Sequence, residues 1–173
     1  MPRVSLILTV IGADHPGLVE KLATTVSANG GNWLESRMAH LAGQFAGILQ
    51  VETTADNVRQ PQSALAALAD EGLQTTIEVD RQTQPAESPP LLRLDLVGHD
   101  RPGIVREITH VLTEQQANVE ELETDVTAAA NTGQALFRAT IRVQLPPGGS
   151  IRRLQEALEG VAADMMVDIR RQA

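Results

Sequence analysis

The sequence predicts an α+β protein made of two similar domains in tandem, each with the element order βαββαβ and an antiparallel four-stranded sheet. One observation is an internal repeat: Gly12-Ala-Asp-His-Pro-Gly-Leu-Val19 matches Gly98-His-Asp-Arg-Pro-Gly-Ile-Val105 at an offset of 86 residues. The same offset pairs Asn32 with Asn118. The second observation is that apolar residues change between alternating and helical spacing in the same order in both copies.

The first half of the second copy shows how each element is predicted. Leu92-Arg-Leu-Asp-Leu96 alternates apolar and polar residues, which is the period of a half-buried strand. Asp100 and Pro102 then supply helix start signals. The helix after them is indicated by apolar residues at helical spacing: Ile104, Val105, Ile108, Val111 and Leu112. A second strand is expected from Asn118 to about Thr127.

The second half completes the domain. Residues 128–133 are interpreted as a hairpin tip, longer than in the first copy, and residues 137–145 alternate as a third strand. Ser150 follows a Pro-Pro-Gly-Gly break and can cap the next helix. The buried face of that helix would carry Ile151, Leu154, Leu158 and Val161. A fourth strand is expected around Met165, Val167 and Ile169.

The first copy repeats this order over residues 1–81. Its strands are expected near residues 3–11, 32–42, 45–54 and 73–81, and its helices near 15–29 and 61–71. Residues 82–90 contain three prolines and are predicted to link it to a second domain at 91–173. The simplest packing is the ferredoxin-like arrangement, with both helices on one face of each sheet. The two sheets could join side by side within one chain, and a homodimer is equally compatible.

One face of the first sheet is unusually apolar. If Leu6, Leu8 and Val10 point toward the helices, the opposite face carries Ile7, Ile11 and Ile48. A sheet covered on one side normally has a polar outer face. Two explanations are open: another subunit covers this face, or one strand is buried on both sides.

Composition excludes several classes of function. The formal net charge is -8 and Lys21 is the single lysine, so direct binding to nucleic acid is not expected. The absence of cysteine removes disulfides, thiolate metal sites and cysteine nucleophiles. The apolar run Val4–Ile11 is too short for a membrane span and lacks a cleavage-site pattern. We therefore expect a cytoplasmic protein without membrane contact.

The repeated Gly-x-Asp-x-Pro-Gly loop is the best candidate for a ligand site. Unpaired N–H groups at a helix N-terminus suit a carboxylate, and glycine lets a ligand approach the backbone. An aspartate or an asparagine carbonyl could accept hydrogen bonds from an ammonium group. The pattern thus predicts binding of a small amino acid by two sets of residues: Gly12, Asp14, Gly17 and Asn32 in the first copy, and Gly98, Asp100, Gly103 and Asn118 in the second.

Each of these residues also has a purely structural interpretation. Asp14 and Asp100 could simply cap their helices, with the neighbouring Gly and Pro setting the turn. Asn32 and Asn118 could serve only as turn residues at strand entry. The sequence leaves both interpretations open.

No catalytic, cofactor or metal site is predicted. The four histidines have neither i,i+4 partners nor CxxC neighbours: His15, His40, His99 and His110. No Gly-x-Ser-x-Gly motif or phosphate-binding loop is present. A small enzyme of the acylphosphatase type would need an arginine for phosphate. Only Arg101 suggests one, and the first copy has His15 at that position.

The loop, an asparagine sixteen residues after its proline, and the βαββαβ order together resemble the ACT domain. Two copies, with Asn32-Trp-Leu-Glu-Ser-Arg-Met38 and the following Gly-Gln-Phe-Ala, resemble the glycine cleavage system transcriptional repressor family. That resemblance implies a ligand site lined by the loop and the second-strand asparagine between paired domains. Some serine-binding relatives have a histidine two residues before the loop's polar position, where Gly12 and Gly98 stand here.

The leading hypothesis is therefore a non-enzymatic regulator that binds a small amino acid, with glycine as the first candidate. It would act on a transcription factor through protein contact. The alternative is a regulatory subunit of an amino-acid biosynthetic enzyme. We expect the two sites to differ in affinity, because Gly30-Gly31 precedes Asn32 whereas Gln116-Ala117 precedes Asn118. The Asn32 region would be the better preserved.

Overall fold

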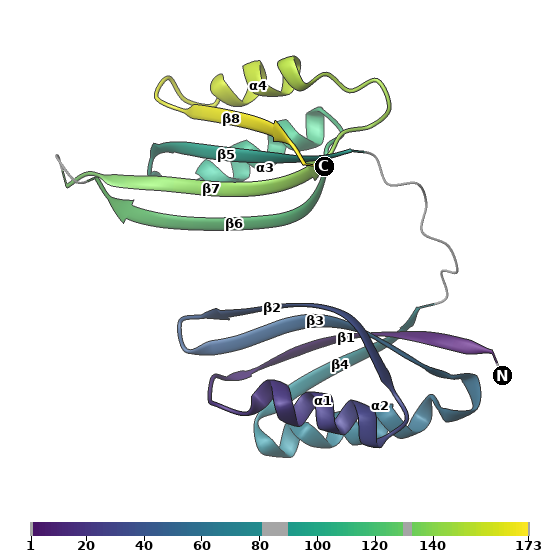
Figure 1. The fold of residues 1–173 in the computed structure, drawn as a ribbon. Coiled ribbons are helices and arrows are strands. Elements are labelled where there is room, and N and C mark those ends of the chain that lie inside the picture. Colours follow the sequence, from purple (N-terminus) through teal and green to yellow (C-terminus); the bar gives the residue numbers. More distant parts are fainter. Residues whose placement is uncertain (1, 81–89, 130–132, 173) are drawn as a thin grey trace. The chain divides into compact units, whose positions relative to one another are not determined.

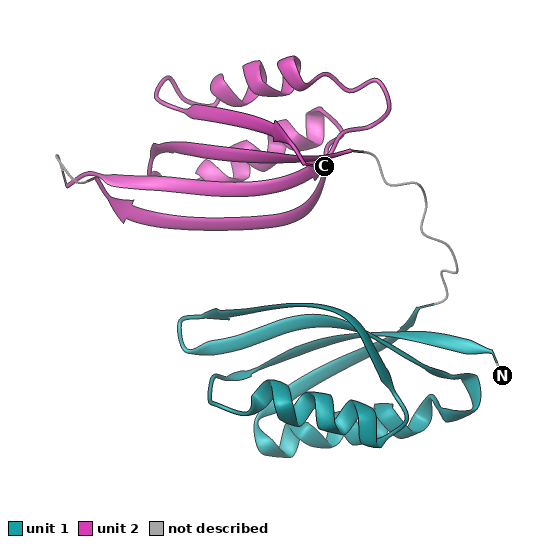
Figure 2. Cartoon of the chain, in the orientation of Figure 1, with its two compact units in different colours: residues 1–84 teal, residues 85–173 magenta. Residues whose placement is uncertain are grey.

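The computed structural model describes residues 2–80, 90–129 and 133–172 (Figure 1). The chain divides into two compact units, residues 1–84 and 85–173 (Figure 2). Of the predicted linker 82–90, all but Pro90 lies outside the described residues, as does the centre of the predicted hairpin tip at 130–132.

Unit 1 is a βαββαβ domain. Its elements are β1 (Arg3–Ala13), α1 (Leu18–Ala28), β2 (Asn32–Leu41), β3 (Gln44–Thr54), α2 (Arg59–Ala66) and β4 (Leu73–Asp80), with 3-10 turns η1 (Ala55–Asn57) and η2 (Ala67–Glu71) flanking α2. The strands form an antiparallel sheet in the order β2-β3-β1-β4. Both helices cover the same face of this sheet (Figure 1).

Unit 2 repeats the arrangement. Its elements are β5 (Leu91–His99), α3 (Ile104–Glu114), β6 (Asn118–Ala128), β7 (Ala135–Gln144), α4 (Ile151–Glu159) and β8 (Met166–Arg171). The antiparallel order is β6-β7-β5-β8, again with both helices on one face (Figure 1). The predicted pair of ferredoxin-like βαββαβ domains is therefore confirmed.

Each unit has its own aliphatic core between sheet and helices. The fully buried side chains of unit 1 include Leu6, Leu8, Leu22, Leu49 and Leu65, and those of unit 2 include Leu94, Leu96, Ile108, Ile141 and Leu154. The apolar residues that alternate along the strands therefore pack against the apolar faces of the helices, as the sequence predicted. Ser150 caps α4 as expected, accepting a hydrogen bond from the Arg153 backbone N–H at 3.3 Å.

Some predicted details were wrong. The second helix of unit 1 ends at Ala66, and residues 67–71 tighten into η2 instead of continuing to 71 as α-helix. Met165 precedes β8 and is buried against the core of unit 2. His110 does have an i,i+4 partner, because its Nε2 lies 3.5 Å from Glu114 Oε1. That partner is a single exposed carboxylate.

Within unit 1 the outer face of the first sheet is exposed. Ile11 on β1 and Ile48 on β3 keep 48% and 47% of their surface exposed, so the explanation that one strand is buried on both sides within its own unit is wrong. Among the described residues, no helix is both long and apolar enough to span a membrane.

Candidate functional site

In unit 1 the loop between β1 and α1 is held against two neighbouring turns. The Asp14 backbone N–H donates to the Gly43 carbonyl at 3.0 Å, which ties the loop to the β2–β3 turn. Gly12 is buried, and a Cβ there would lie 2.6 Å from the Gly72 carbonyl oxygen. Gly12 is thus required for backbone packing against the turn at Gly72, and its contact with a ligand stays a prediction.

Gly17 has a different role. It is the N-cap residue of α1 with φ 94°, in the left-handed region that glycine adopts without strain. A Cβ on Gly17 would meet nothing within 4 Å. Gly103 repeats this at α3, with φ 89° and equally open space. Both helices therefore begin at a glycine whose backbone faces open space.

The helix-capping interpretation of the loop aspartates is wrong. No side-chain cap hydrogen bond is made at the start of α1 or of α3, and the N-cap positions are Gly17 and Gly103. The first amide N–H groups of a helix lack intrahelical partners. Asp14 and Asp100 stand three residues before these caps, so their carboxylates remain available for other contacts.

Charged side chains surround the loop of unit 1. His40 Nε2, from the end of β2, lies 3.6 Å from Asp14 Oδ2. Lys21, in the first part of α1, forms an ion pair with Glu71 in η2. All four side chains are partly exposed to solvent. This end of the unit thus combines an accessible carboxylate, an uncapped helix N-terminus and a nearby cation.

The loop of unit 2 is held by ion pairs of its own. Arg101 donates to Glu107 in the first part of α3 and, from Nη2, to the Val161 carbonyl at 3.2 Å. The hydrogen bond from Arg101 lowers the pKa of Glu107. Arg101 therefore lies across the start of α3, where unit 1 has His15. Its guanidinium is already hydrogen-bonded to Glu107 and to the Val161 carbonyl, which removes support for the hypothesis of an acylphosphatase-type enzyme.

His99 links the same loop to the segment before β8. Its backbone N–H donates to Asp164 Oδ2 at 2.7 Å, and its ring Nδ1 lies 2.7 Å from the same oxygen. The backbone hydrogen bond from His99 lowers the pKa of Asp164. Nε2 of His99 lies 2.9 Å from Oε1 of Gln134, the residue just before β7. Ala13, the aligned residue in unit 1, offers no such contacts.

The two asparagines lie far from the loop of their own unit. Asn32 is opposite Glu52, which is opposite Ser5, whereas Gly12 is opposite Phe45. Seven register positions separate Ser5 from Gly12, roughly 23 Å at about 3.3 Å per residue. The second unit has the same register. Each unit by itself therefore does not bring its asparagine and its Gly-x-Asp-x-Pro-Gly loop together.

The side chains of the asparagines also differ. Asn118 Nδ2 donates to Glu120 Oε1 at 2.6 Å, so part of the Asn118 amide is already hydrogen-bonded.

Gly30 and Gln116, which precede Asn32 and Asn118 by two residues, share a left-handed conformation, with φ 74° and 53°. The Gly30-to-Gln116 difference, predicted to alter the second site, thus leaves the backbone path into the strand the same.

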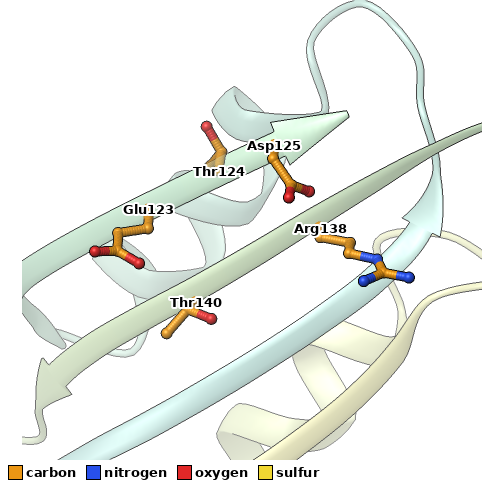
Figure 3. Close-up of a pocket in the computed structure, with 5 residues that line it drawn as sticks. All are labelled: Glu123, Thr124, Asp125, Arg138 and Thr140. Carbon is orange, nitrogen blue, oxygen red and sulfur yellow. The ribbon is translucent and has the colours of Figure 1, made fainter. Parts of the chain in front are cut away.

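A pocket of about 360 Å³ lies on the outer face of unit 2, lined by Glu123, Thr124, Asp125, Arg138 and Thr140 (Figure 3). Asp125 and Arg138 are neighbours in the β6–β7 register. Thr140 donates to Asp95 Oδ1 at 2.9 Å, and a hydrogen bond from Arg93 lowers the pKa of Asp95. The sequence did not predict this pocket, although the polar residues that alternate along residues 138–144 indicate a hydrophilic face.

Within the described ranges, no group of three or more His, Asp and Glu side chains could hold a metal ion.

Comparison with known proteins identifies relatives for both units. The ACT domain family model matches residues 5–79 and 91–172. The glycine cleavage system transcriptional repressor of Escherichia coli (strain K12) is 24% identical over 165 residues, covering 92% of this chain and 85% of that protein. A crystal structure of an unknown protein from Galdieria sulphuraria is 30% identical, with a TM-score of 0.86 over 99% of this chain and 100% of the other. A candidate glycine cleavage system transcriptional repressor has the same fold, with a TM-score of 0.74 at 17% identity, over 99% of this chain and 100% of the other.

Proposed function

The chain belongs to the ACT domain family, and from this premise we propose that it is a regulatory protein that binds a small amino acid and transmits binding to a protein partner. The observation that carries the proposal is the loop end of unit 1. There the uncapped N-terminus of α1 and the carboxylate of Asp14 are both accessible. No reaction on the ligand and no cofactor is part of the proposal.

The two groups complement the two ends of an amino acid. Its carboxylate would accept hydrogen bonds from the first amides of α1, favoured by the helix dipole. The open space around Gly17 lets the ligand approach that backbone. The ammonium group would pair with Asp14, in competition with His40 at 3.6 Å. Glycine is the first ligand to test, because the E. coli relative is named for the glycine cleavage system.

Asn32 could contact only a ligand that is bound outside its own unit. Because Asn32 lies at the far end of the sheet from its own loop, its amide would have to reach a loop that does not belong to unit 1. We propose this role for Asn32, and correspondingly for Asn118, as secondary to the contacts of the loop itself.

Unit 2 is proposed to bind more weakly. Arg101 and Glu107 already pair across the start of α3, so a ligand carboxylate would meet a guanidinium that has a partner and a nearby negative charge. Unit 1 has Lys21, a cation, at the position aligned with Glu107. The expected difference in affinity thus rests on the loop side chains of Gly98–Gly103 and not on Gly30.

The protein partner is proposed to be a transcription factor. The net charge of -8 disfavours contact with DNA phosphates, so an effect on transcription would run through protein contact. A ligand shifts such contact only by its differential affinity for two states of the protein. Affinity capture with and without amino acid separates the alternatives: a DNA-binding regulator supports the proposal, and a biosynthetic enzyme supports the regulatory-subunit hypothesis.

Calorimetric titration of the full chain with glycine, serine, alanine and aspartate tests the ligand step. Asp14→Asn should weaken binding about 10- to 100-fold, because a hydrogen bond to a charged group contributes about 1.5–3 kcal/mol. Asp100→Asn is the matched control in unit 2 and should leave the tighter site unchanged. Absence of heat and of thermal stabilisation with every amino acid would exclude the proposed ligand class.

A further inference from the structure

The outer face of the sheet in unit 2, on the side away from α3 and α4, carries charged side chains. Most of its arginines are paired with a carboxylate of the same face, at 2.9 Å for Arg93 and Asp95, 3.1 Å for Arg142 and Glu121, and 2.5 Å for Arg170 and Asp168. Arg138, on β7, is the exception, because it forms no ion pair or hydrogen bond with a described residue. Its guanidinium therefore remains available for another acceptor.

Glu123 and Asp125 are unpaired carboxylates on the same face. They occupy alternate positions of β6, so both side chains point to the same side of the sheet. Neither forms an ion pair or hydrogen bond with a described residue, although Asp125 is opposite Arg138 in the β6–β7 register. The carboxylate of Asp95 on β5 is already occupied, because it accepts hydrogen bonds from two other side chains.

The unpaired side chains of Arg138, Glu123 and Asp125 line the same pocket of about 360 Å³ (Figure 3). A volume of this size lies within the range of small-molecule sites, about 300–1,000 Å³. Arg138 points toward β5 and away from Glu123 and Asp125, so the positive and negative groups lie at different ends of the pocket. Thr140 also lines the pocket, and its hydroxyl is fixed by the hydrogen bond to Asp95 at 2.9 Å.

Unit 1 shows that the fold does not require these charges. By register, Asp125 and the opposite Arg138 correspond to Ala39 and the opposite Ala46. Unit 1 forms the same four-stranded antiparallel sheet with alanine at both positions. The unpaired charges of the unit 2 pocket are therefore available for binding and are not needed to build the sheet.

We propose that this pocket binds an elongated zwitterion, a small molecule with a carboxylate at one end and an ammonium group at the other. The carboxylate would accept hydrogen bonds from the Arg138 guanidinium, whose parallel N–H groups match its two oxygens. The ammonium group would donate to Glu123 and Asp125. A ligand with only one of these charges would meet the opposing group of the pocket without compensation: an anion would face two carboxylates, and a cation would face Arg138.

The geometry sets the length of the ligand. The two carboxylates stand on β6, whereas Arg138 extends from β7 toward β5 (Figure 3). The two ends of the ligand must therefore be separated by one to two strand spacings, about 5–10 Å. Glycine carries both charges on one carbon and is too short to reach both ends. This site and its ligand class are thus independent of the amino-acid site proposed at the loop of unit 1.

Amide NMR titration of the full chain with ε-aminocaproate, which has the required separation of charges, tests the proposal. Signals of β6 and β7 should shift and saturate. Caproate lacks the ammonium group and hexylamine lacks the carboxylate, so each should bind about 5-fold more weakly or worse. Glycine should leave the β6 and β7 signals unchanged.

Substitutions assign each end of the ligand. Arg138→Gln should weaken ε-aminocaproate binding about 5-fold or more and leave hexylamine binding no weaker than before. Asp125→Asn should reduce the preference for ε-aminocaproate over caproate. Arg152→Gln is the matched control, because it removes the same charge from unit 2 on the exposed side of α4, where Arg152 pairs with Glu156.

The ligand comparison on the unaltered chain decides the proposal even if a variant fails to fold, which circular dichroism would reveal. Absence of shifts in β6 and β7 would overturn it. So would equal binding of ε-aminocaproate, caproate and hexylamine, or an equal loss in folded Arg138→Gln and Arg152→Gln. If glycine binds nowhere while ε-aminocaproate binds this pocket, the pocket stands and only the proposed loop site is lost.

Discussion

Arg101 and Glu107 form a bidentate pair across the start of α3, with Nη1 2.7 Å from Oε1 and Nη2 2.5 Å from Oε2. Arg101 Nη2 also reaches the Val161 carbonyl after α4. One side chain thereby ties the loop to both helices of unit 2. In unit 1 the aligned positions are His15 and Lys21, and Lys21 pairs instead with Glu71. The two repeats stabilise equivalent loops with different ion pairs.

This pairing predicts acid sensitivity in unit 2. The pKa values of Glu107, Asp164 and Asp95 are all lowered, by hydrogen bonds from Arg101, His99 and Arg93 in turn. A lowered folded-state pKa contributes stability that is present above the unfolded-state value of about 4, and that is lost as pH falls through the folded-state value. The free energy of unfolding of unit 2 should therefore decrease as pH falls below about 4. Urea titrations at pH 5 and pH 3, followed by circular dichroism, measure the loss.

Trp33 fluorescence allows the unfolding of unit 1 to be followed separately in the same experiment. It is the sole tryptophan and lies in β2, so its fluorescence reports unit 1. Arg101→Gln should reduce the acid-dependent loss in the circular dichroism signal and leave the Trp33 transition unchanged. Arg153→Gln is the matched control in unit 2, because the Arg153 charge is not among the causes of the lowered pKa values of Glu107, Asp164 and Asp95. An unchanged acid dependence in Arg101→Gln would contradict the assignment to the Arg101–Glu107 pair.

The two motif glycines at the ends of β1 and β5 should respond differently to alanine. A Cβ on Gly12 would lie 2.6 Å from the Gly72 carbonyl oxygen, and the backbone must shift to make room. A Cβ on Gly98 would lie 3.4 Å from the flexible end of Met165. Gly12→Ala should therefore cost about 1–3 kcal/mol of stability, as overpacking does, and Gly98→Ala much less. Urea denaturation followed by Trp33 fluorescence for the first and circular dichroism for the second compares them, and equal losses would refute the packing argument.

The fold was predictable because its signals are local. Alternation such as Leu92-Arg-Leu-Asp-Leu96 and the helical spacing from Ile104 to Leu112 each identify an element without tertiary information. The repeat then fixed the number of domains. The separation of Asn32 from Asp14 also follows from topology, because the helix between them returns the chain to the opposite end of the sheet.

The contacts of the site were less predictable, since they join residues far apart in sequence. Lys21 meets Glu71, and His99 meets Asp164, only once the strand order brings those turns together. Backbone conformation is similarly hidden. Gln116 adopts the left-handed conformation that residue type alone would assign only to its counterpart Gly30.

The left-handed conformation of Gln116 predicts that glycine at this position would stabilise unit 2. It follows α3 by two residues with φ 53°, and its N–H donates to the Thr113 carbonyl at 2.9 Å. A side chain in this region costs about 1–2 kcal/mol, and glycine is preferred just after a helix. Glycine also has more freedom to lose on folding, which offsets part of the gain. Gln116→Gly should raise the stability of unit 2 by about 0.5–1 kcal/mol.

Gly30→Ala in unit 1 is the matched comparison, because it removes a glycine from the equivalent left-handed position. A Cβ on Gly30 would be strained at φ 74° and would lie 2.5 Å from Asn57 Nδ2, which donates to the Asn29 carbonyl at 2.9 Å. Gly30→Ala should therefore destabilise unit 1, both through backbone strain and through displacement of Asn57. Urea midpoints from circular dichroism for Gln116→Gly, and from Trp33 fluorescence for Gly30→Ala, should move in opposite directions. Midpoints that move together would mean that the left-handed conformation is not what sets the stability of these two turns.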